Sequence, residues 1–132
     1  AIEIAPETPG LFHQRGAARA EQDKHPEAIN DYGKAIQLRP GYPDVYLDRG
    51  NSYHALGKLD QAERDYSEAI RLRPGYAEAY ANRAAVRAQM GKPGESQEDA
   101  EQARSLGISQ ADIDTLLRAA EEERAASPSD HG

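Results

Sequence analysis

The fold is decided by the stretch IQLRPGY at residues 36–42, which returns as IRLRPGY at residues 70–76. The offset is 34 residues, and the same offset relates further pairs of identical residues: Gly16 and Gly50, Ala28 and Ala62, Asp31 and Asp65, Tyr32 and Tyr66, Ala35 and Ala69. One repeat of this length cannot bury its own apolar face, so it must stack on a neighbour. Stacked repeats present an extended surface, and such surfaces mostly bind other proteins.

The period divides most of the chain into three repeats, at about residues 9–42, 43–76 and 77–107. Each repeat reads as two helices joined by a short turn. Pro9 and Pro43 open the first helices of their repeats, because proline suits the first helical turn, where its missing N–H had no partner.

A further helix is expected after the third repeat, at about residues 110–126, with Ser109 as its cap. Its apolar residues fall on one face, at the spacing i, i+3, i+4, i+7: Ile113, Leu116, Leu117 and Ala120. Such a helix caps a repeat array, with one face for the last repeat and one for water. Residues 1–8 read as a flexible leader and 127–132 as a disordered tail, which leaves residues 9–126 as a single domain.

The repeated residues also indicate how the helices pack. A mid-helix glycine costs about 1 kcal/mol relative to alanine, so Gly16 and Gly50 indicate close helix approach, with Ala28 and Ala62 as the small facing residues. Phe12, Tyr46 and Tyr80 recur at the same offset, and we expect them to fill gaps between helices. The third repeat departs from this pattern, with Ala84, Ser96 and Ala100 in place of Gly50, Ala62 and Tyr66.

Taken together, these residues resemble the tetratricopeptide repeat family. The second repeat carries the full set of signature residues: Tyr46, Gly50, Tyr53, Ala62, Tyr66, Ala69 and Pro74. The first repeat matches at Phe12, Gly16, Ala28, Tyr32, Ala35 and Pro40, with Arg19 in place of the first-helix tyrosine. The resemblance implies an all-α fold: a right-handed α-solenoid of helix-turn-helix repeats whose first helices line a concave groove. It also implies a non-catalytic role in protein binding, without a cofactor.

Composition excludes several classes of function. The chain carries 16 Lys and Arg against 23 Asp and Glu, a formal net charge of −7, so it lacks the basic stripe of a nucleic-acid binder. It has no cysteine, which removes disulfides and thiol chemistry, and no apolar run of about 18 residues that could span a membrane. The expected state is soluble. The compartment stays open between the cytoplasm and the periplasm or exterior after removal of a signal peptide.

The candidate partner-binding residues lie on the first helices of the repeats: His13, Gln14, Asp44, Leu47, Asp48, Asn51, His54, Glu78, Asn82 and Ala85. This face includes Glu21, Asp44, Asp48 and Glu78 but no Lys or Arg. One hypothesis is a groove for a peptide with basic residues, attracted by complementary charge. The alternative is a solvated acidic face on an acidic protein, and the sequence leaves both open.

Part of the family binds the C-terminal carboxylate of chaperone tails through Lys, Asn and Arg side chains on the groove helices. In one register the required basic positions hold His13, Glu78 and Asn82, and in the next they hold Leu47, Asp112 and Leu116. Acidic side chains at such positions would repel a carboxylate, which argues against such a ligand.

Each repeat carries one arginine on its first helix and one aspartate on its second: Arg15 and Asp31, Arg49 and Asp65, Arg83 and Asp99. We expect the two residues of each repeat to form an exposed ion pair, which contributes about 0–1 kcal/mol to the free energy of unfolding.

The sequence offers less support for two other classes of function, an enzyme and a structural module. His13 and His54 lie near carboxylates, but the sequence has no His pair at i, i+4 spacing and no phosphate loop, so we expect neither a metal site nor catalysis. The alternative is a structural or self-association module, in a weak homo-oligomer or in a larger protein. An apolar edge around Leu11 and Phe12 would be left at the first repeat, where it could pair with another subunit or with a further part of a longer chain.

Overall fold

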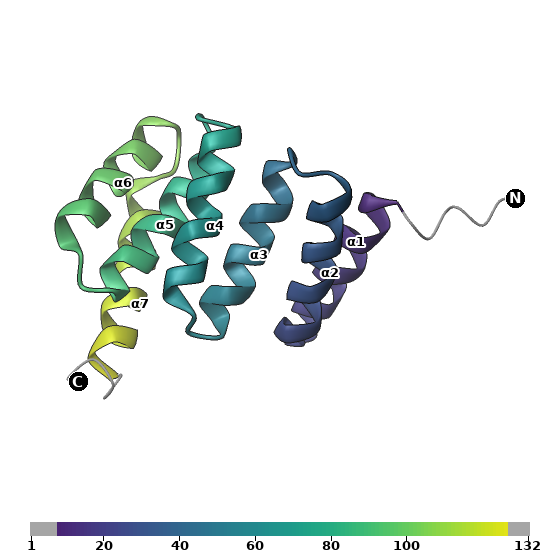
Figure 1. The fold of residues 1–132 in the computed structure, drawn as a ribbon. Coiled ribbons are helices and arrows are strands. Elements are labelled where there is room, and N and C mark those ends of the chain that lie inside the picture. The colour runs from purple at the N-terminus through teal and green to yellow at the C-terminus, as the bar shows by residue number, and fades with distance from the viewer. Residues whose placement is uncertain (1–7, 127–132) are drawn as a thin grey trace, which may run out of the picture. The chain divides into compact units, whose positions relative to one another are not determined.

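The structure, a computed structural model, describes residues 8–126, which form seven α-helices and no strand (Figure 1). The helices are α1 (Pro9–Glu21), α2 (His25–Leu38), α3 (Pro43–Ala55), α4 (Leu59–Leu72), α5 (Ala77–Gln89), α6 (Pro93–Ser105) and α7 (Gln110–Ala126). This confirms the all-α helical-repeat fold. The predicted leader, apart from Thr8, and the predicted tail lie outside the described residues.

The chain forms two compact units, Ala1–Arg73 with α1 to α4 and Pro74–Gly132 with α5 to α7. Each unit is described by itself below, and the single domain over residues 9–126 stays a prediction. Unit 1 contains the first two repeats as the hairpins α1–α2 and α3–α4, with α2 packed on α3 between them. Unit 2 contains the third repeat, α5–α6, and α7.

The helix boundaries follow the local sequence. The second residue after each first helix is left-handed, with φ of 62° at Asp23, 75° at Gly57 and 79° at Gly91. Glycine adopts this conformation without steric cost. Ser109 caps α7 as predicted, since its Oγ accepts a hydrogen bond from the Asp112 N–H at 3.1 Å. Helix α4 begins at Leu59, so Asp60 lies in its first turn.

The close approach predicted at the mid-helix glycines is present, but its partner differs from the prediction. A Cβ on Gly16 would lie 2.7 Å from a ring carbon of Tyr32, and a Cβ on Gly50 would lie 2.8 Å from one of Tyr66. Each glycine therefore faces a buried tyrosine ring, whereas Ala28 was expected to be the facing residue of Gly16. The alanine is fully buried as well. The glycine is required because the tyrosine ring fills the space in front of it.

Unit 2 fills the same space differently. Ala84 replaces the glycine and Ala100 replaces the tyrosine, and both belong to a buried cluster with Ile113 of α7. Ser96 donates a hydrogen bond from Oγ to the Ala84 carbonyl at 2.8 Å. Methyl groups and an isoleucine from the added helix thus replace one large ring.

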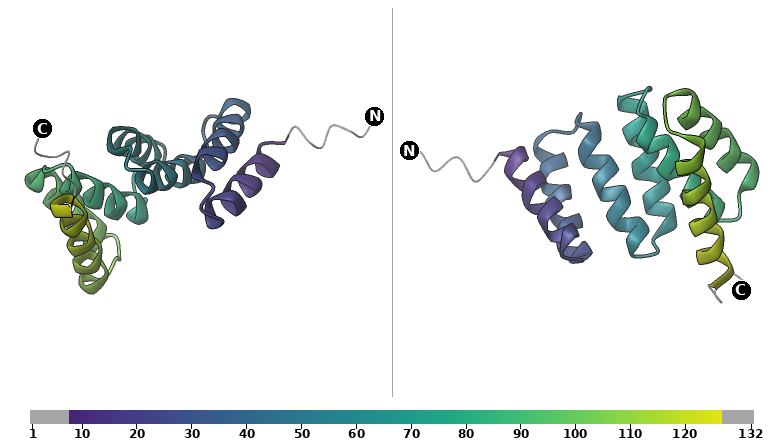
Figure 2. Two further views of the ribbon diagram at one scale, coloured as in Figure 1. Left: turned by 90° about the horizontal axis from the view of Figure 1, so that it is seen from below. Right: turned by 180° about the vertical axis from the view of Figure 1, so that it is seen from behind.

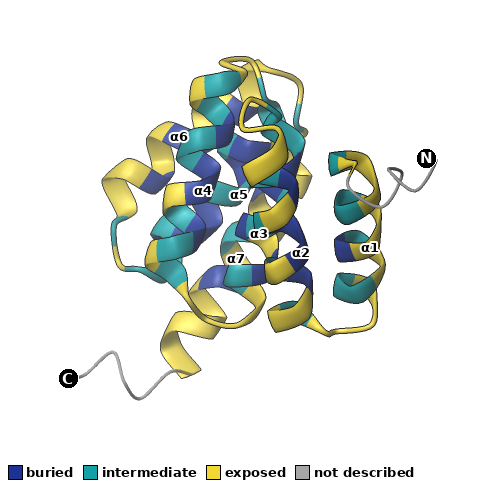
Figure 3. Cartoon of the chain, turned by 45° about the vertical axis from the view of Figure 1, so that its right-hand side comes forward, coloured by how far each residue is buried: buried dark blue, intermediate teal, exposed yellow. Residues whose placement is uncertain are grey.

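The capping helix packs as its apolar stripe predicted. Ile113 and Ala120 are buried, and Leu116 and Leu117 pack on the same clusters. The view from behind in Figure 2 shows α7 lying along unit 2, in keeping with its packing against α5 and α6. Figure 3 shows the C-terminal turns of α7 exposed.

Replacing Gly50 with alanine tests the glycine–tyrosine contact. The added methyl would collide with the Tyr66 ring, which is 0% exposed and is held by its hydroxyl at 2.6 Å from the Asn51 Oδ1. We expect Gly50→Ala to destabilise the protein by about 1–3 kcal/mol in urea unfolding, despite the better helix propensity of alanine.

Gly33→Ala is the matched control. It lies mid-helix in α2, and a Cβ there would meet only the Nη1 of Arg49 at 4.0 Å. This change should stabilise by up to about 1 kcal/mol. Equal stabilisation by both changes would contradict the glycine–tyrosine contact.

Candidate functional site

Each repeat contains an arginine on its first helix that binds an aspartate on its second helix with two hydrogen bonds. Arg15 Nε and Nη2 donate to the two oxygens of Asp31 at 3.1 and 2.7 Å. The equivalent distances are 2.7 and 2.9 Å for Arg49 with Asp65. They are both 2.8 Å for the pair in the third repeat. The predicted pairing is present in all three repeats.

The pairs differ from the prediction in their burial. The side chains of Asp31, Asp65 and Asp99 are only 0%, 8% and 5% exposed. The arginines reach them from the surface and place their guanidinium carbons 5.5–5.8 Å from the ring centres of Phe12, Tyr46 and Tyr80. A buried carboxylate without its partner is costly, so these pairs contribute more to hairpin geometry than exposed pairs would.

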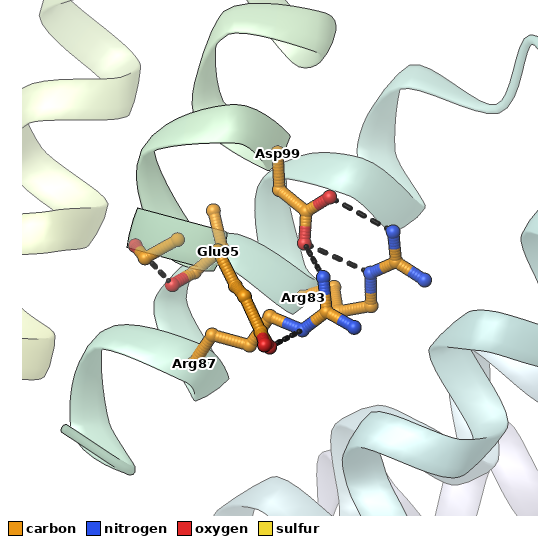
Figure 4. A network of polar contacts seen from close by, with 6 residues as sticks. Arg83, Arg87, Glu95 and Asp99 are labelled. Atoms are coloured by element: carbon orange, nitrogen blue, oxygen red, sulfur yellow. Dashed lines mark hydrogen bonds and ion pairs between the residues drawn. The ribbon is translucent and has the colours of Figure 1, made fainter. Parts of the chain in front are cut away.

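A second arginine reinforces the pair in the first and third repeats. Arg87 Nη1 donates to Asp99 Oδ2 at 2.9 Å, and its Nε lies 3.6 Å from Glu95 Oε1 (Figure 4). Arg19 binds Asp31 in the same way at 2.9 Å. The second repeat has Tyr53 at this position, so Asp65 has a single arginine.

Replacing Arg49 with alanine tests the structural role of this pair. Because it would leave the Asp65 carboxylate buried without its partner, we expect a loss of about 3 kcal/mol in the free energy of unfolding. Arg64→Ala is the control, since Arg64 is exposed and should change stability by less than about 0.5 kcal/mol. Unchanged unfolding of Arg49→Ala would refute the structural role.

The Asp31 carboxyl predicts a dependence of stability on pH. Burial raises the pKa of this carboxyl, but the hydrogen bonds and charges of Arg15 and Arg19 outweigh burial, so its pKa lies below the ordinary value. A group whose pKa is lowered by folding stabilises the fold above its unfolded pKa, which is about 3.9 for aspartate. That stabilisation is lost as the pH falls through the folded pKa.

We therefore expect the free energy of unfolding to fall as the pH is lowered from about 5 to below 3. Asp31→Asn should be less stable at pH 7 and should lose less stability across this interval. The measurement is urea unfolding at a series of pH values. An equally steep acid loss in the variant would assign the effect to other carboxylates.

The side of α1 and α3 that carries the predicted site residues is called the first-helix face of unit 1. On it, a histidine and an aspartate connect α1 to α3. His13 Nε2 lies 2.6 Å from Asp48 Oδ2, and because an ionised carboxylate only accepts, this nitrogen carries the hydrogen. The imidazole also lies edge-on to Tyr32 and Tyr42, with ring centres 5.9 and 5.8 Å away. The side chains of His13 and Asp48 are 20% and 32% exposed, so a ligand can still reach them.

The other predicted site residues of unit 1 differ in accessibility. Asp44 is half-buried, and its Oδ1 accepts a hydrogen bond from Arg73 at 3.3 Å. Gln14 and Asn51 are exposed, and His54 is half-buried. Leu47 is only 4% exposed, so it supports this face from within and offers little surface to a partner.

Of the three site residues predicted on α5 in unit 2, Glu78 is exposed and Asn82 is half-buried. Ala85 was also predicted to line the groove, but it is only 2% exposed and clusters with Ala88 and Ala120, so it offers little surface to a partner. The capping helix covers this part of α5, which the repeat pattern alone does not reveal.

A second surface of unit 1 was not singled out from the sequence. Two hollows, of about 530 and 350 Å³, share Arg49 in their walls. The larger is lined from α2, in part by Ile29, Gly33, Lys34 and Ile36. The smaller is lined from α3 and α4, by Tyr53, Gln61, Arg64 and Asp65 besides Arg49. We call the two hollows together the second-helix groove.

The only sequence signal for this groove is that the second repeat departs from the other two. Tyr53 and Arg64 correspond to Arg19 and Asn30 in the first repeat. These differences change the hydrogen-bonding groups at the surface without changing the period.

Within residues 8–126, no group of three or more His, Asp or Glu side chains is arranged to hold a metal ion. None of the helices described is both long enough and apolar enough to span a bilayer.

A family model described as TPR repeat matches residues 16–57 and 50–91, which together make up more than half of the chain. No curated protein matches the sequence.

Several solved structures are similar over nearly the whole chain. The first TPR of Spaghetti (RPAP3), bound to the HSP90 peptide SRMEEVD, is 27% identical with a TM-score of 0.80, and the alignment covers 96% of this chain and 100% of that chain. The first TPR domain of human RPAP3 is 28% identical with a TM-score of 0.79, over 92% and 95% of the two chains. The TPR2B domain of yeast Sti1, in its complex with pHsp70, is 21% identical with a TM-score of 0.79, over 87% and 97%, and shows the fold alone.

Proposed function

This chain belongs to the tetratricopeptide repeat family, and from that premise we propose that it is a non-catalytic scaffold that binds a peptide segment of a partner protein. The observation that carries the proposal is the match over nearly the full length of both chains to a domain that holds a peptide. The proposed contact surface in unit 1 is the first-helix face, with His13, Gln14, Asp44, Asp48, Asn51 and His54. Glu78 and Asn82 are the proposed contact residues of unit 2.

The chemistry of the first-helix face supports a ligand with Lys or Arg side chains. Asp48 receives its hydrogen bond from a histidine, and Asp44 from an arginine at the end of α4. About a third of each carboxylate side chain remains exposed, at 32% for Asp48 and 35% for Asp44. A cationic ligand group can therefore bind to either carboxylate, and charge of this kind speeds association and selects the partner.

The same residues argue against the ligand of the similar domain. The peptide SRMEEVD contains two glutamates and ends in an aspartate. Here His13 is already hydrogen-bonded to Asp48. Glu78 adds a further negative charge on the first-helix face of unit 2. Carboxylates facing a carboxylate cost free energy. We propose that the partner segment differs in charge from the HSP90 peptide.

The test is a pull-down from native lysate with the unaltered protein and with Asp48→Lys/Glu78→Lys, followed by mass spectrometry. Proteins that bind through the first-helix faces should be retained by the first and lost by the second, since two carboxylates become cations. Asp60→Lys/Glu98→Lys is the matched control, because both of its acidic residues are exposed on second helices. It should retain the same partners as the unaltered protein.

Two results would contradict the proposal. One is an identical set of partners with and without the two lysines, which would move binding to another surface. The other is tight binding of the synthetic peptide SRMEEVD, measured by titration calorimetry, which would show that the acidic face accepts an acidic tail.

Self-association is the second candidate, supported by an exposed apolar edge on α1. Leu11 is 46% exposed, and with Phe12, Gln14 and Arg15 it lines a hollow of about 470 Å³. Sedimentation that shows a mass rising with concentration would favour this function, and a monomer throughout would exclude it.

A further inference from the structure

The second-helix groove is cationic on an acidic protein. Its walls carry three cations, Lys34, Arg49 and Arg64, and one carboxylate, Asp65. Both oxygens of that carboxylate are bound by Arg49, and its side chain is only 8% exposed. The groove therefore presents positive charge to a ligand, whereas the whole chain has a net charge of −7.

Two of these cations are available to a ligand. Arg64 is exposed and makes no hydrogen bond or ion pair with the residues between 8 and 126. The Nζ of Lys34 lies 5.5 Å from the centre of the Phe12 ring, an interaction that leaves its hydrogen-bonding capacity unused. Arg49 keeps 22% of its side chain exposed and, although it binds Asp65, lines both hollows.

The smaller hollow is suited to a carboxylate because it offers neutral donors beside the cations. Tyr53 supplies a hydroxyl and Gln61 supplies an amide. The other repeats cannot form this arrangement. At the position of Gln61 they carry Glu27 and Glu95, and in the third repeat that glutamate lies 3.6 Å from Arg87. An anion site is thus specific to the second repeat.

The larger hollow adds apolar surface to this charge. Ile29 and Ile36 line it from α2, and both are half-buried. Gly33 lies between them and has no side chain, and the nearest atom to a Cβ there would be Arg49 Nη1 at 4.0 Å. A long side chain at this position would extend into the hollow.

We propose that the second-helix groove binds an acidic, amphipathic peptide segment of a partner protein. Its apolar side chains lie on Ile29 and Ile36 over Gly33, and its carboxylates contact Lys34 and Arg64. Apolar anchors with flanking charge are the usual way in which an amphipathic helix is held in a groove. This site is distinct from the first-helix face and takes a ligand of the opposite charge.

The probe is a fluorescent 15-residue amphipathic peptide of leucine and glutamate, compared with a peptide in which lysine replaces every glutamate. We expect anisotropy titrations of the unaltered protein to show binding of the glutamate peptide, weakened by salt, and stronger than binding of the lysine peptide. Lys34→Glu/Arg64→Glu should reduce the affinity for the glutamate peptide by about tenfold or more. The control Arg104→Glu/Arg118→Glu makes the same charge change at exposed positions of α6 and α7 and should leave the affinity within about twofold.

A pair of variants at Gly33 tests the steric part of the proposal at constant charge. Gly33→Gln should fill the larger hollow and weaken binding, whereas Gly33→Ala should leave it largely open and binding unchanged. Both replace a helical glycine, so neither is expected to unfold the protein. Circular dichroism of each variant verifies the fold.

Four results would overturn the proposal. They are no binding of the glutamate peptide up to about 1 mM, equal affinity for both peptides, unchanged affinity in Lys34→Glu/Arg64→Glu, and unchanged affinity in a folded Gly33→Gln. Displacement of the glutamate peptide by a single-stranded RNA oligonucleotide at lower concentration would assign the groove to nucleic acid instead.

Discussion

Each helical hairpin depends on the contact between one arginine and one buried aspartate. The carboxylate is buried, and an unpaired buried charge would be costly, so the two helices must align in the register that brings the guanidinium to it. The same guanidinium also lies near an aromatic ring of its own helix. One side chain therefore links the aspartate of the second helix to the apolar seam of the first. The cost of burying a charge selects the hairpin geometry here more than the attraction of the pair stabilises it.

Much of the fold could be predicted from the sequence because it depends on spacing. The 34-residue offset, the prolines that open helices and the stripe on α7 are all periodic, and each appears where expected. The sequence-based predictions that fail concern which side chain of a neighbouring helix a residue faces and how deeply it is buried. Sequence shows that Gly16 needs a close neighbour, but not that the neighbour is the ring of Tyr32. It shows that Arg49 and Asp65 recur, but not that the carboxylate is buried.

In the candidate sites too, the features that follow from the repeat could be predicted and the others could not. Positions on the first helices follow from the repeat, so most of the predicted residues of unit 1 are accessible. The burial of Ala85 does not follow from the repeat, because it depends on α7, which is not part of the repeat. The second-helix groove could not be found by periodicity, since Tyr53, Gln61 and Arg64 are departures from it. Unit 1 thus has carboxylates on its first-helix face and cations in the second-helix groove. Exposed residues can vary between repeats because the buried Arg–Asp pairs keep the geometry of the hairpins unchanged.

The altered core of the third repeat has a consequence for the order in which mutations could have accumulated. If the ancestor of this repeat had the glycine and tyrosine of the second, changing the glycine first would have placed a methyl within 3 Å of a ring, as at Gly50. Losing the tyrosine first leaves a cavity, and Ile113 of α7 now occupies this region beside Ala84 and Ala100. The gain in helix propensity from alanine is then available without a clash. From such an ancestor, the path of lower cost begins with the loss of the tyrosine, because Ile113 of the capping helix can fill the space that the ring leaves.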